Sequence, residues 1–301
     1  MSYNDISLSA SSRTNLLTLQ NTASLIARTQ DRLSSGLAVK SATDDAVKYF
    51  QAKSLSSRSK DLTERKDSIN QGVSALDAAL KATDGIETML QSIKGKLDAS
   101  RSQTATDRKA TQKQINELIS QLDKLVDDAS YQGLNLLNST GSKLVVRFSE
   151  KSTSKLTVNG VDLNANKILS AGAFAASSVG STNVTALGFT QGLSAYLFSN
   201  PNEVASFNNR TDAAILKIEA TINSVRAKAA TMATNSDILK VRLDFTSEYT
   251  NVLQAGADKL TLADLNSEGA NLLALQTRQQ IGIQALSFAG QSEQGVLSLF
   301  R

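Results

Sequence analysis

The sequence predicts a mainly α protein: a long antiparallel helical coiled-coil rod built from paired N- and C-terminal segments, with a small β-containing insertion. Three observations lead to this fold class. Apolar residues recur at helical spacing through most of the chain. The two ends carry more apolar positions than one face of a helix can hold. Near the middle, small polar and β-branched residues replace the helical pattern.

The first forty residues contain an a/d seam with alternating spacings of three and four. The seam consists of Leu16, Leu19, Ala23, Ile26, Gln30, Leu33 and Leu37. Leu17 and Leu25 lie off this seam, so the predicted helix carries more than one apolar stripe. A helix of this kind needs neighbours on more than one side.

The segment after this seam predicts that one helix ends and a new helix begins. Gly36 predicts a helix end or kink, and Ser41 with Asp44 forms a capping box that predicts a new helix from about Ala42. The adjacent carboxylates of Asp44 and Asp45 point about 100° apart on a helix. With no histidine in the chain, we interpret them as charges that complement the helix dipole, in preference to an acid/base pair.

Three further helical stretches form the predicted rod. The first runs to about residue 100 and carries Leu62, Ile69, Val73, Leu76, Leu80, Leu90, Ile93 and Leu97. After a polar break at about 100–108, the second returns antiparallel and ends near Gly133; it carries Ile115, Leu118, Leu122, Leu125 and Val126. The third resumes near Asp212 with Ile215, Ile218, Ile222, Val225, Ala229 and Met232, and continues with Ile238, Val241, Phe245 and Leu253.

The middle of the chain indicates β-structure. Residues 144–148 read as a strand, and residues 156–163 read as a hairpin with a type I′ turn at Asn159-Gly160. Residues 165–205 have too weak a pattern for an assignment.

The last segment, from about Asp258 to Arg301, is predicted to be a helix with two apolar stripes. One side carries Leu265, Leu272, Leu275, Ile283, Leu286, Leu297 and Phe300. Nearly the opposite side carries Ile281, Phe288 and Leu299 with Ala263, Ala270, Ala274 and Ala285. Such a helix is either buried inside a globular domain or covered by other copies of the chain. Its position at a chain end favours other copies, and hence a polymer subunit.

Composition excludes most catalytic chemistry. Among the 301 residues there is no His, Cys or Trp, so the usual zinc, haem and iron-sulfur sites, a Cys nucleophile and a Ser-His-Asp triad cannot form. We therefore expect no enzyme activity, no catalytic residue, no metal and no cofactor. The net charge of +4 is small, and basic residues alternate with acidic ones, so no nucleic-acid partner is expected. No apolar run is long enough for membrane insertion, and the N-terminal residues lack the pattern of a cleaved signal peptide.

Two end segments carry a family resemblance. RLSSGLAVKSATDDA at 32–46 resembles the hallmark N-terminal segment of bacterial flagellins, and residues 263–301 are similar to their C-terminal segment nearly throughout. Residues 71–93 and 115–137 also look like the inner rod of that family. The family motif is carried by Arg32, Leu33, Ser34, Ser35, Gly36, Asp44 and Asp45. Hook-filament junction proteins share the N-terminal pattern and form the alternative within the family.

The resemblance implies three parts. Residues 1–42 and 262–301 would form a terminal coiled-coil domain that lines the inner tube of a filament. Residues 43–140 and 205–261 would form a helical rod domain, and residues 141–204 a small outer region. The implied function is a structural subunit that self-assembles into the extracellular flagellar filament, the propeller for swimming. Type III export without signal cleavage is also implied. The implied partners are further copies of the chain, an export chaperone, and the cap and hook-junction proteins.

The candidate site is a set of assembly or coiled-coil contacts on the two end segments. They are Leu16, Leu19, Ile26, Leu33, Leu37, Leu265, Leu272, Leu275, Ile281, Ile283, Leu286, Phe288, Leu297, Leu299 and Phe300. The stretch that an innate immune receptor recognises in enteric flagellins reads differently here, with Ser92, Lys94, Gly95 and Lys96, which predicts weak recognition. A secreted helical effector or adhesin, which would not self-assemble, is the alternative from another functional class.

Overall fold

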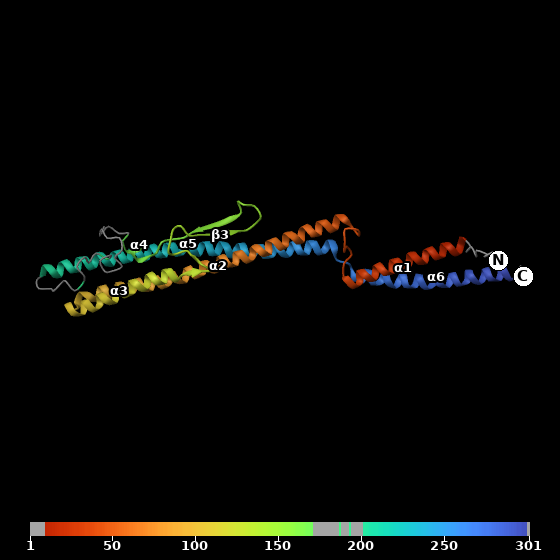
Figure 1. Cartoon of the computed structure of the whole chain (residues 1–301). Helices are drawn as coiled ribbons and strands as arrows, with labels where there is room; N and C mark the ends of the chain where they lie inside the picture. The colour runs from red at the N-terminus through yellow and green to blue at the C-terminus, as the bar shows by residue number, and fades with distance from the viewer. Residues whose placement is uncertain (1–9, 171–186, 188–192, 194–200, 300–301) are drawn as a thin grey trace, which may run out of the picture. The chain divides into compact units, whose positions relative to one another are not determined.

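The computed structural model of the chain describes residues 10–170, 187, 193 and 201–299. In chain order (Figure 1) it contains α1 (Ala10–Ser35), α2 (Ala46–Ala99), a short 3-10 helix η1 (Ser100–Ser102), α3 (Ala105–Asp128), β1 (Ser130–Tyr131), β2 (Leu134–Asn135), β3 (Lys143–Arg147), β4 (Lys155–Asn159), α4 (Ala165–Ser170), α5 (Pro201–Thr261) and α6 (Leu265–Leu299). The predicted fold class, mainly helical with a small β-containing insertion, is confirmed.

The chain forms two compact units. The first, the terminal unit, comprises Met1–Lys60 and Asn251–Arg301, and the second, the rod unit, comprises Asp61–Thr250. Both α2 and α5 continue through the boundary between the units. The predicted three-part division at residues 42, 140, 204 and 261 stays a prediction.

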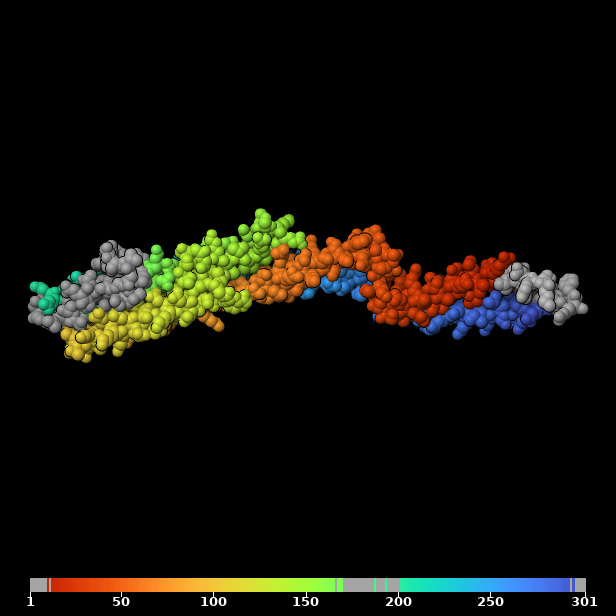
Figure 2. Space-filling model, viewed as in Figure 1, coloured from red at the N-terminus to blue at the C-terminus, as the bar shows by residue number. Residues whose placement is uncertain are grey.

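In the terminal unit, α1 and α6 lie antiparallel to each other. Figure 1 shows them side by side, and Figure 2 shows their side chains in contact along the pair. Leu19 packs over Gly282. A Cβ added to this glycine would lie 2.9 Å from the Cδ2 atom of Leu19. The small residue therefore lets the two helices approach closely at this point.

The connection from α1 to α2 differs from the prediction in where α2 begins. Gly36 ends α1 with a φ of +72°, and its amide donates to the Arg32 carbonyl at 2.8 Å. The Asp44 carboxylate accepts from the Ser41 amide at 2.9 Å, as a capping box requires, but α2 starts at Ala46 instead of about Ala42. Asp45 is the residue that caps α2, because its Oδ1 accepts from the Lys48 amide at 3.0 Å.

The predicted continuous helix from Asp258 onward is wrong, because the chain leaves helical geometry at residues 262–264. An isolated β-bridge joins Leu37 to Leu262 there, and the Ala263 amide donates to the Gly36 carbonyl at 2.9 Å. Asp264 then caps α6 by accepting from the Asn266 amide at 3.0 Å. The two helix breaks thus satisfy each other's backbone groups, which a periodicity argument cannot detect.

In the rod unit, α2, α3 and α5 supply most of the buried core. Its fully buried side chains include Ile69, Leu76, Ile86, Leu90, Ile93, Leu97, Ile115, Leu122, Phe207, Ile218 and Leu239. The helix α3 begins at Ala105, inside the predicted break, because the Thr104 side chain accepts from the Asp107 amide and caps it. Similarly α5 begins at Pro201 instead of near Asp212. Proline suits the first turn of a helix, where its missing N–H costs no hydrogen bond.

Three ion pairs at seven-residue intervals join α5 to the preceding part of the rod unit, two of them from α2 and the third, at Arg101, from η1. Arg226 Nε donates to Glu87 Oε2 at 3.1 Å, Lys94 Nζ donates to Glu219 Oε1 at 2.6 Å, and Arg101 pairs with Asp212. The residue numbers rise on α2 while they fall on α5, so the two helices run antiparallel with an unbroken register over this length. We call these three pairs the ion-pair ladder.

The predicted hairpin at residues 156–163 is wrong, although both predicted strand segments exist. β4 pairs with β3, with Leu144 opposite Val158 and Val146 opposite Leu156. The Gly160 amide donates to the Ser142 carbonyl at 2.7 Å, so Asn159-Gly160 continues the pairing and makes no turn. Residues 148–154 form the loop instead. This arrangement turns Val146 and Val158 into the core, where both are buried.

Candidate assembly surfaces

The least exposed positions of α1 form a seam that is largely polar. They are Ser12, Asn15, Leu19, Thr22, Ile26, Thr29 and Arg32, again at spacings of three and four. On α6, the less exposed positions include Glu268, Leu272, Leu275, Gln279, Gly282 and Leu286. The Thr22 hydroxyl donates to the Thr18 carbonyl at 2.8 Å, so burial of this threonine leaves no donor unpaired.

This seam is rotated from the predicted one, with which it shares Leu19 and Ile26. Leu16 and Leu33 are 39% and 37% exposed, and Ala23 and Gln30 are also exposed. Sequence reasoning assigned these leucines to the helix pair because they follow the alternating three- and four-residue spacing of an a/d seam. The structure instead leaves these leucines available on the outer side of the pair.

The outer faces of α1 and α6 carry exposed apolar side chains. On α1 these are Leu16, Leu17, Leu25 and Leu33, and on α6 they are Leu265, Leu273, Ile281, Ile283 and Phe288. Ile281 and Phe288 are 60% and 71% exposed. So many large apolar side chains on two adjacent helices exceed what a monomer normally leaves in water.

The predicted contact residues fall into three groups. Leu16, Leu33, Leu265, Ile281, Ile283 and Phe288 are exposed, whereas Leu19, Ile26, Leu37, Leu272, Leu275 and Leu286 are buried or partly buried. Phe300 and the side chains of Leu297 and Leu299 lie outside the described residues. Sequence reasoning missed Leu273, which is 67% exposed, because it lies between the two stripes assigned to this helix. Whether the predicted set makes contacts between copies stays a prediction.

The motif residues at 32–45 hold the α1–α2 connection. Arg32 Nη1 donates to Glu268 Oε1 at 3.0 Å and so ties α1 to α6. Asp44 accepts hydrogen bonds from the amide and hydroxyl of Ser41 and from the Lys40 amide. These bonds stabilise the carboxylate and lower the pKa of Asp44 below its ordinary value. The two adjacent aspartates therefore have structural roles, one in the loop and one as a helix cap.

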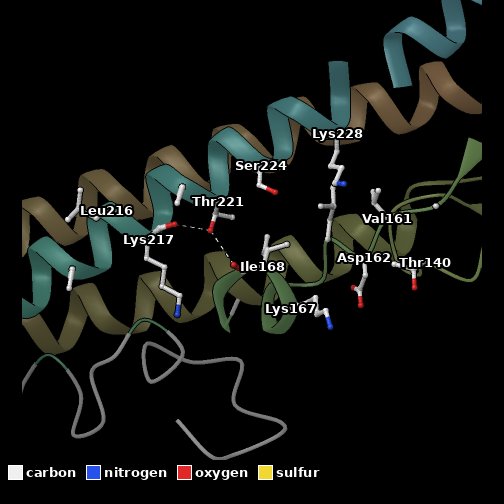
Figure 3. Close-up of a pocket in the computed structure, with 14 residues that line it drawn as sticks. Thr140, Val161, Asp162, Lys167, Ile168, Leu216, Lys217, Thr221, Ser224 and Lys228 are labelled. Atoms are coloured by element: carbon white, nitrogen blue, oxygen red, sulfur yellow. Dashed lines mark hydrogen bonds between the residues drawn. The ribbon is translucent and has the colours of Figure 1, made fainter. Parts of the chain in front are cut away.

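A groove of about 700 Å³ lies in the rod unit between α5 and the segment that leads into α4 (Figure 3). Its wall is mostly apolar, and Lys167, Lys217 and Lys228 lie around it. Burial lowers the pKa of Lys217. Among the described residues, no cluster of three metal-ligating side chains occurs, and the residues around this groove form no recognisable catalytic set.

Comparison with known proteins identifies the family. The model of the bacterial flagellin N-terminal helical region matches residues 6–142, and that of the C-terminal helical region matches residues 215–300. The chain belongs to the bacterial flagellin family. Flagellin FljK of Caulobacter vibrioides is 29% identical, and the alignment covers 100% of both chains. A flagellin of Brucella melitensis is also 29% identical, with 97% of each chain covered.

The flagellin fold is also found in a solved structure. A protein from Vibrio parahaemolyticus assigned as flagellar hook-associated superposes with a TM-score of 0.57, at 15% identity, over 73% of this chain and 100% of its own. At this identity the likeness concerns the fold alone. The predicted flagellin family is confirmed, and its hook-filament junction alternative has no better support. No helix in the described part of this flagellin-family chain has the length and apolarity to cross a membrane.

Proposed function

We propose that this flagellin-family chain is a structural subunit that polymerises into a flagellar filament through the outer faces of α1 and α6. The single observation that carries the proposal is the exposed apolar surface on both helices, which includes Leu17, Ile281 and Phe288. This surface is what a subunit with neighbours on several sides requires. Full-length similarity to flagellins supports the same function.

The polar seam between α1 and α6 supports this use of the two helices. Its few large apolar side chains, such as Leu19 and Ile26, stabilise the isolated pair only modestly, because threonine buries less apolar surface than leucine. Contacts with further copies would bury the outer leucines and add the missing stabilisation. Folding of the ends and assembly would then be coupled.

The remaining parts of the proposal come from the family. As a filament protein, the chain acts outside the cell and has a mechanical role instead of an enzymatic one. We propose that export follows the flagellar type III route, without cleavage of a signal peptide. An export chaperone, the filament cap and the hook-junction proteins are the proposed partners besides further copies of the chain.

Seeded growth tests the proposed function. Purified protein is added to short filament fragments and followed by light scattering and electron microscopy, alongside a variant that lacks residues 1–40 and 262–301. We expect long filaments from the full chain and none from the truncated variant, whose helical circular dichroism signal should persist. A full chain that stays monomeric with protease-resistant ends would contradict the proposal and favour an effector or adhesin.

A further inference from the structure

In the rod unit, α5 has a second apolar face that points away from its core. Ile238, Val241 and Phe245 are 41%, 68% and 57% exposed, at spacings of three and four residues. Phe245 stacks on Tyr249 with ring centroids 5.8 Å apart. The buried Leu239 and Thr246 directly follow Ile238 and Phe245 and so lie about 100° round the helix from them. This stretch of α5 therefore has one stripe in the core and one in solvent.

Acidic side chains follow one edge of this outer stripe. At 100° per residue, Asp237, Asp244 and Glu248 all fall on the same side of it. All three are exposed, and none has a salt-bridge partner among the residues that the structure describes. We call Ile238, Val241 and Phe245 with these three acids the acidic stripe.

A counterpart with basic residues lies on α2 in the terminal unit. Val47 and Phe50 are 67% and 62% exposed. Lys53 lies next to Phe50 along one edge of the helix, Lys60 lies about two turns farther along the same edge, and both are exposed. Lys53 Nζ lies 5.9 Å from the centroid of the Tyr49 ring, and neither lysine has a salt-bridge partner in the described part of the chain. We call Val47, Phe50, Lys53 and Lys60 the basic stripe.

The charges of the two stripes have matching spacing. Lys53 and Lys60 are seven residues apart, as are Asp237 and Asp244. On both helices the charged edge lies on the same side of the apolar residues, and equivalent edges meet when two helices pack antiparallel. An antiparallel pairing that sets Lys53 against Asp244 therefore sets Lys60 against Asp237. The ion-pair ladder uses the same seven-residue spacing within one chain, between α5 and the residues of α2 and η1.

We propose that the basic stripe of one copy packs against the acidic stripe of a second copy in the filament. This inference rests on the proposed function, since it assigns a subunit contact in addition to those of α1 and α6. The two stripes are different surfaces of the same chain, so the contact is heterologous and leaves one stripe of each pair of copies open to a further copy, as growth of a polymer requires. Phe50 and Phe245 are the apolar anchors, and the edge charges select the orientation.

Cross-linking between two single-cysteine variants tests the contact. The chain has no native cysteine, so Lys53→Cys and Asp244→Cys each provide one reactive thiol. The two full-length variants are mixed, polymerised on wild-type seeds and treated with a short bismaleimide. We expect covalent dimers that contain one copy of each variant. The control pairs Lys53→Cys with Lys113→Cys, on the exposed side of α3, and should give none.

The outcomes separate this inference from the proposed function. Filaments that form without the Lys53–Asp244 cross-link, or that cross-link equally in the control, overturn the contact and leave the filament function standing. Wild-type protein that never elongates seeds contradicts the proposed function itself.

Charge exchange is the second test, and it uses elongation rate at low salt. Lys53→Asp and Asp244→Lys should each slow elongation about fivefold, because edge charges mainly affect association rates. A chain that carries both changes should elongate within about twofold of wild type, since the pair is restored with reversed sign. A double variant as slow as either single variant would overturn the contact, as would single variants with wild-type rates.

Discussion

Gly72 and Gly95 lie on the same helix, α2, in very different surroundings. A Cβ at position 72 would lie 2.7 Å from Val146 Cγ2 and 3.2 Å from Leu239 Cδ1, whereas one at position 95 would meet no atom within 4 Å. Gly72 is therefore the residue that lets the β3–β4 hairpin lie close against α2. At Gly95 the structure gains nothing from the absent side chain, and glycine only lowers helix stability.

Alanine at these two positions should have opposite effects. Gly72→Ala should lower the free energy of unfolding by about 1–3 kcal/mol, because the added methyl overpacks the buried contact with Val146. Gly95→Ala should raise it by about 0.5–1 kcal/mol through helix propensity alone. Urea denaturation of both variants, with helix content followed by circular dichroism, measures the difference. Equal effects at both positions would refute the packing role of Gly72.

At the scale of secondary-structure elements, the ion-pair ladder favours one register between α2 and α5. Apolar side chains along two long helices allow neighbouring registers that differ by one heptad, since such a shift brings equivalent apolar positions together. The Glu87–Arg226 pair has its charges in the opposite order to the other two pairs, so a shift by one heptad sets Glu87 against Glu219 or Lys94 against Arg226. This repulsion disfavours the shifted registers even where each exposed pair contributes little stability. The Arg226 side chain also lowers the pKa of Glu87 through its hydrogen bonds to that carboxylate.

The Glu87–Arg226 pair predicts a pH dependence. Because the pKa of Glu87 in the folded chain lies below its ordinary value of 4.5, the pair stabilises the folded state above that pH. Its contribution is lost as the pH falls through the lowered pKa, where the carboxylate is protonated. Glu87→Gln should therefore melt at a lower temperature than wild type at pH 7, and the difference should shrink below pH 4.5.

Thermal melts of wild type, Glu87→Gln, Arg226→Gln and the double variant measure this coupling. The double variant should lose no more stability than either single variant, because each removes the same pair. A melting difference that stays constant from pH 7 to pH 3 would show that the Glu87 charge has no part in it.

For the whole molecule, the outer face of α6 decides between a monomer and a polymer. Phe288 is 71% exposed, so most of its apolar area is left uncovered by the described chain. A monomer gains solubility from a charge at this position, whereas a subunit loses a buried anchor. The same substitution therefore has opposite consequences under the two alternatives.

Phe288→Glu should abolish elongation of wild-type seeds while leaving the helical circular dichroism signal of the monomer unchanged. Gln284→Glu, an exposed position on the same helix, is the matched control for added charge and should still elongate. Light scattering and electron microscopy measure both. Normal filaments from Phe288→Glu would show that this face of α6 is not a contact between copies.

Much of this architecture could be predicted from local patterns. The spacing of Ile69, Leu76 and Leu90 predicted a long rod helix. A glycine directly after the helical seam predicted the helix end at Gly36, where the structure has a positive φ. The predictions were wrong where a local sequence signal was outweighed by an interaction with residues distant in the sequence. Asn159-Gly160 has the composition of a tight turn, but pairing of β4 with β3 buries Val146 and Val158 and therefore prevails.

The sequence by itself determined the helical rod, the excess of apolar positions at both ends and the family, because periodicity and motifs are local properties that survive without knowledge of contacts. Tertiary structure alone decided which stripe faces which neighbour. Thr22 and Thr29 lie in the α1–α6 seam, while Leu16 and Leu33 lie outside it. Two stripes on one helix have equal periodicity. Only the position of the partner helix, set at Gly282 and by the Arg32–Glu268 pair, distinguishes the inner face from the outer one.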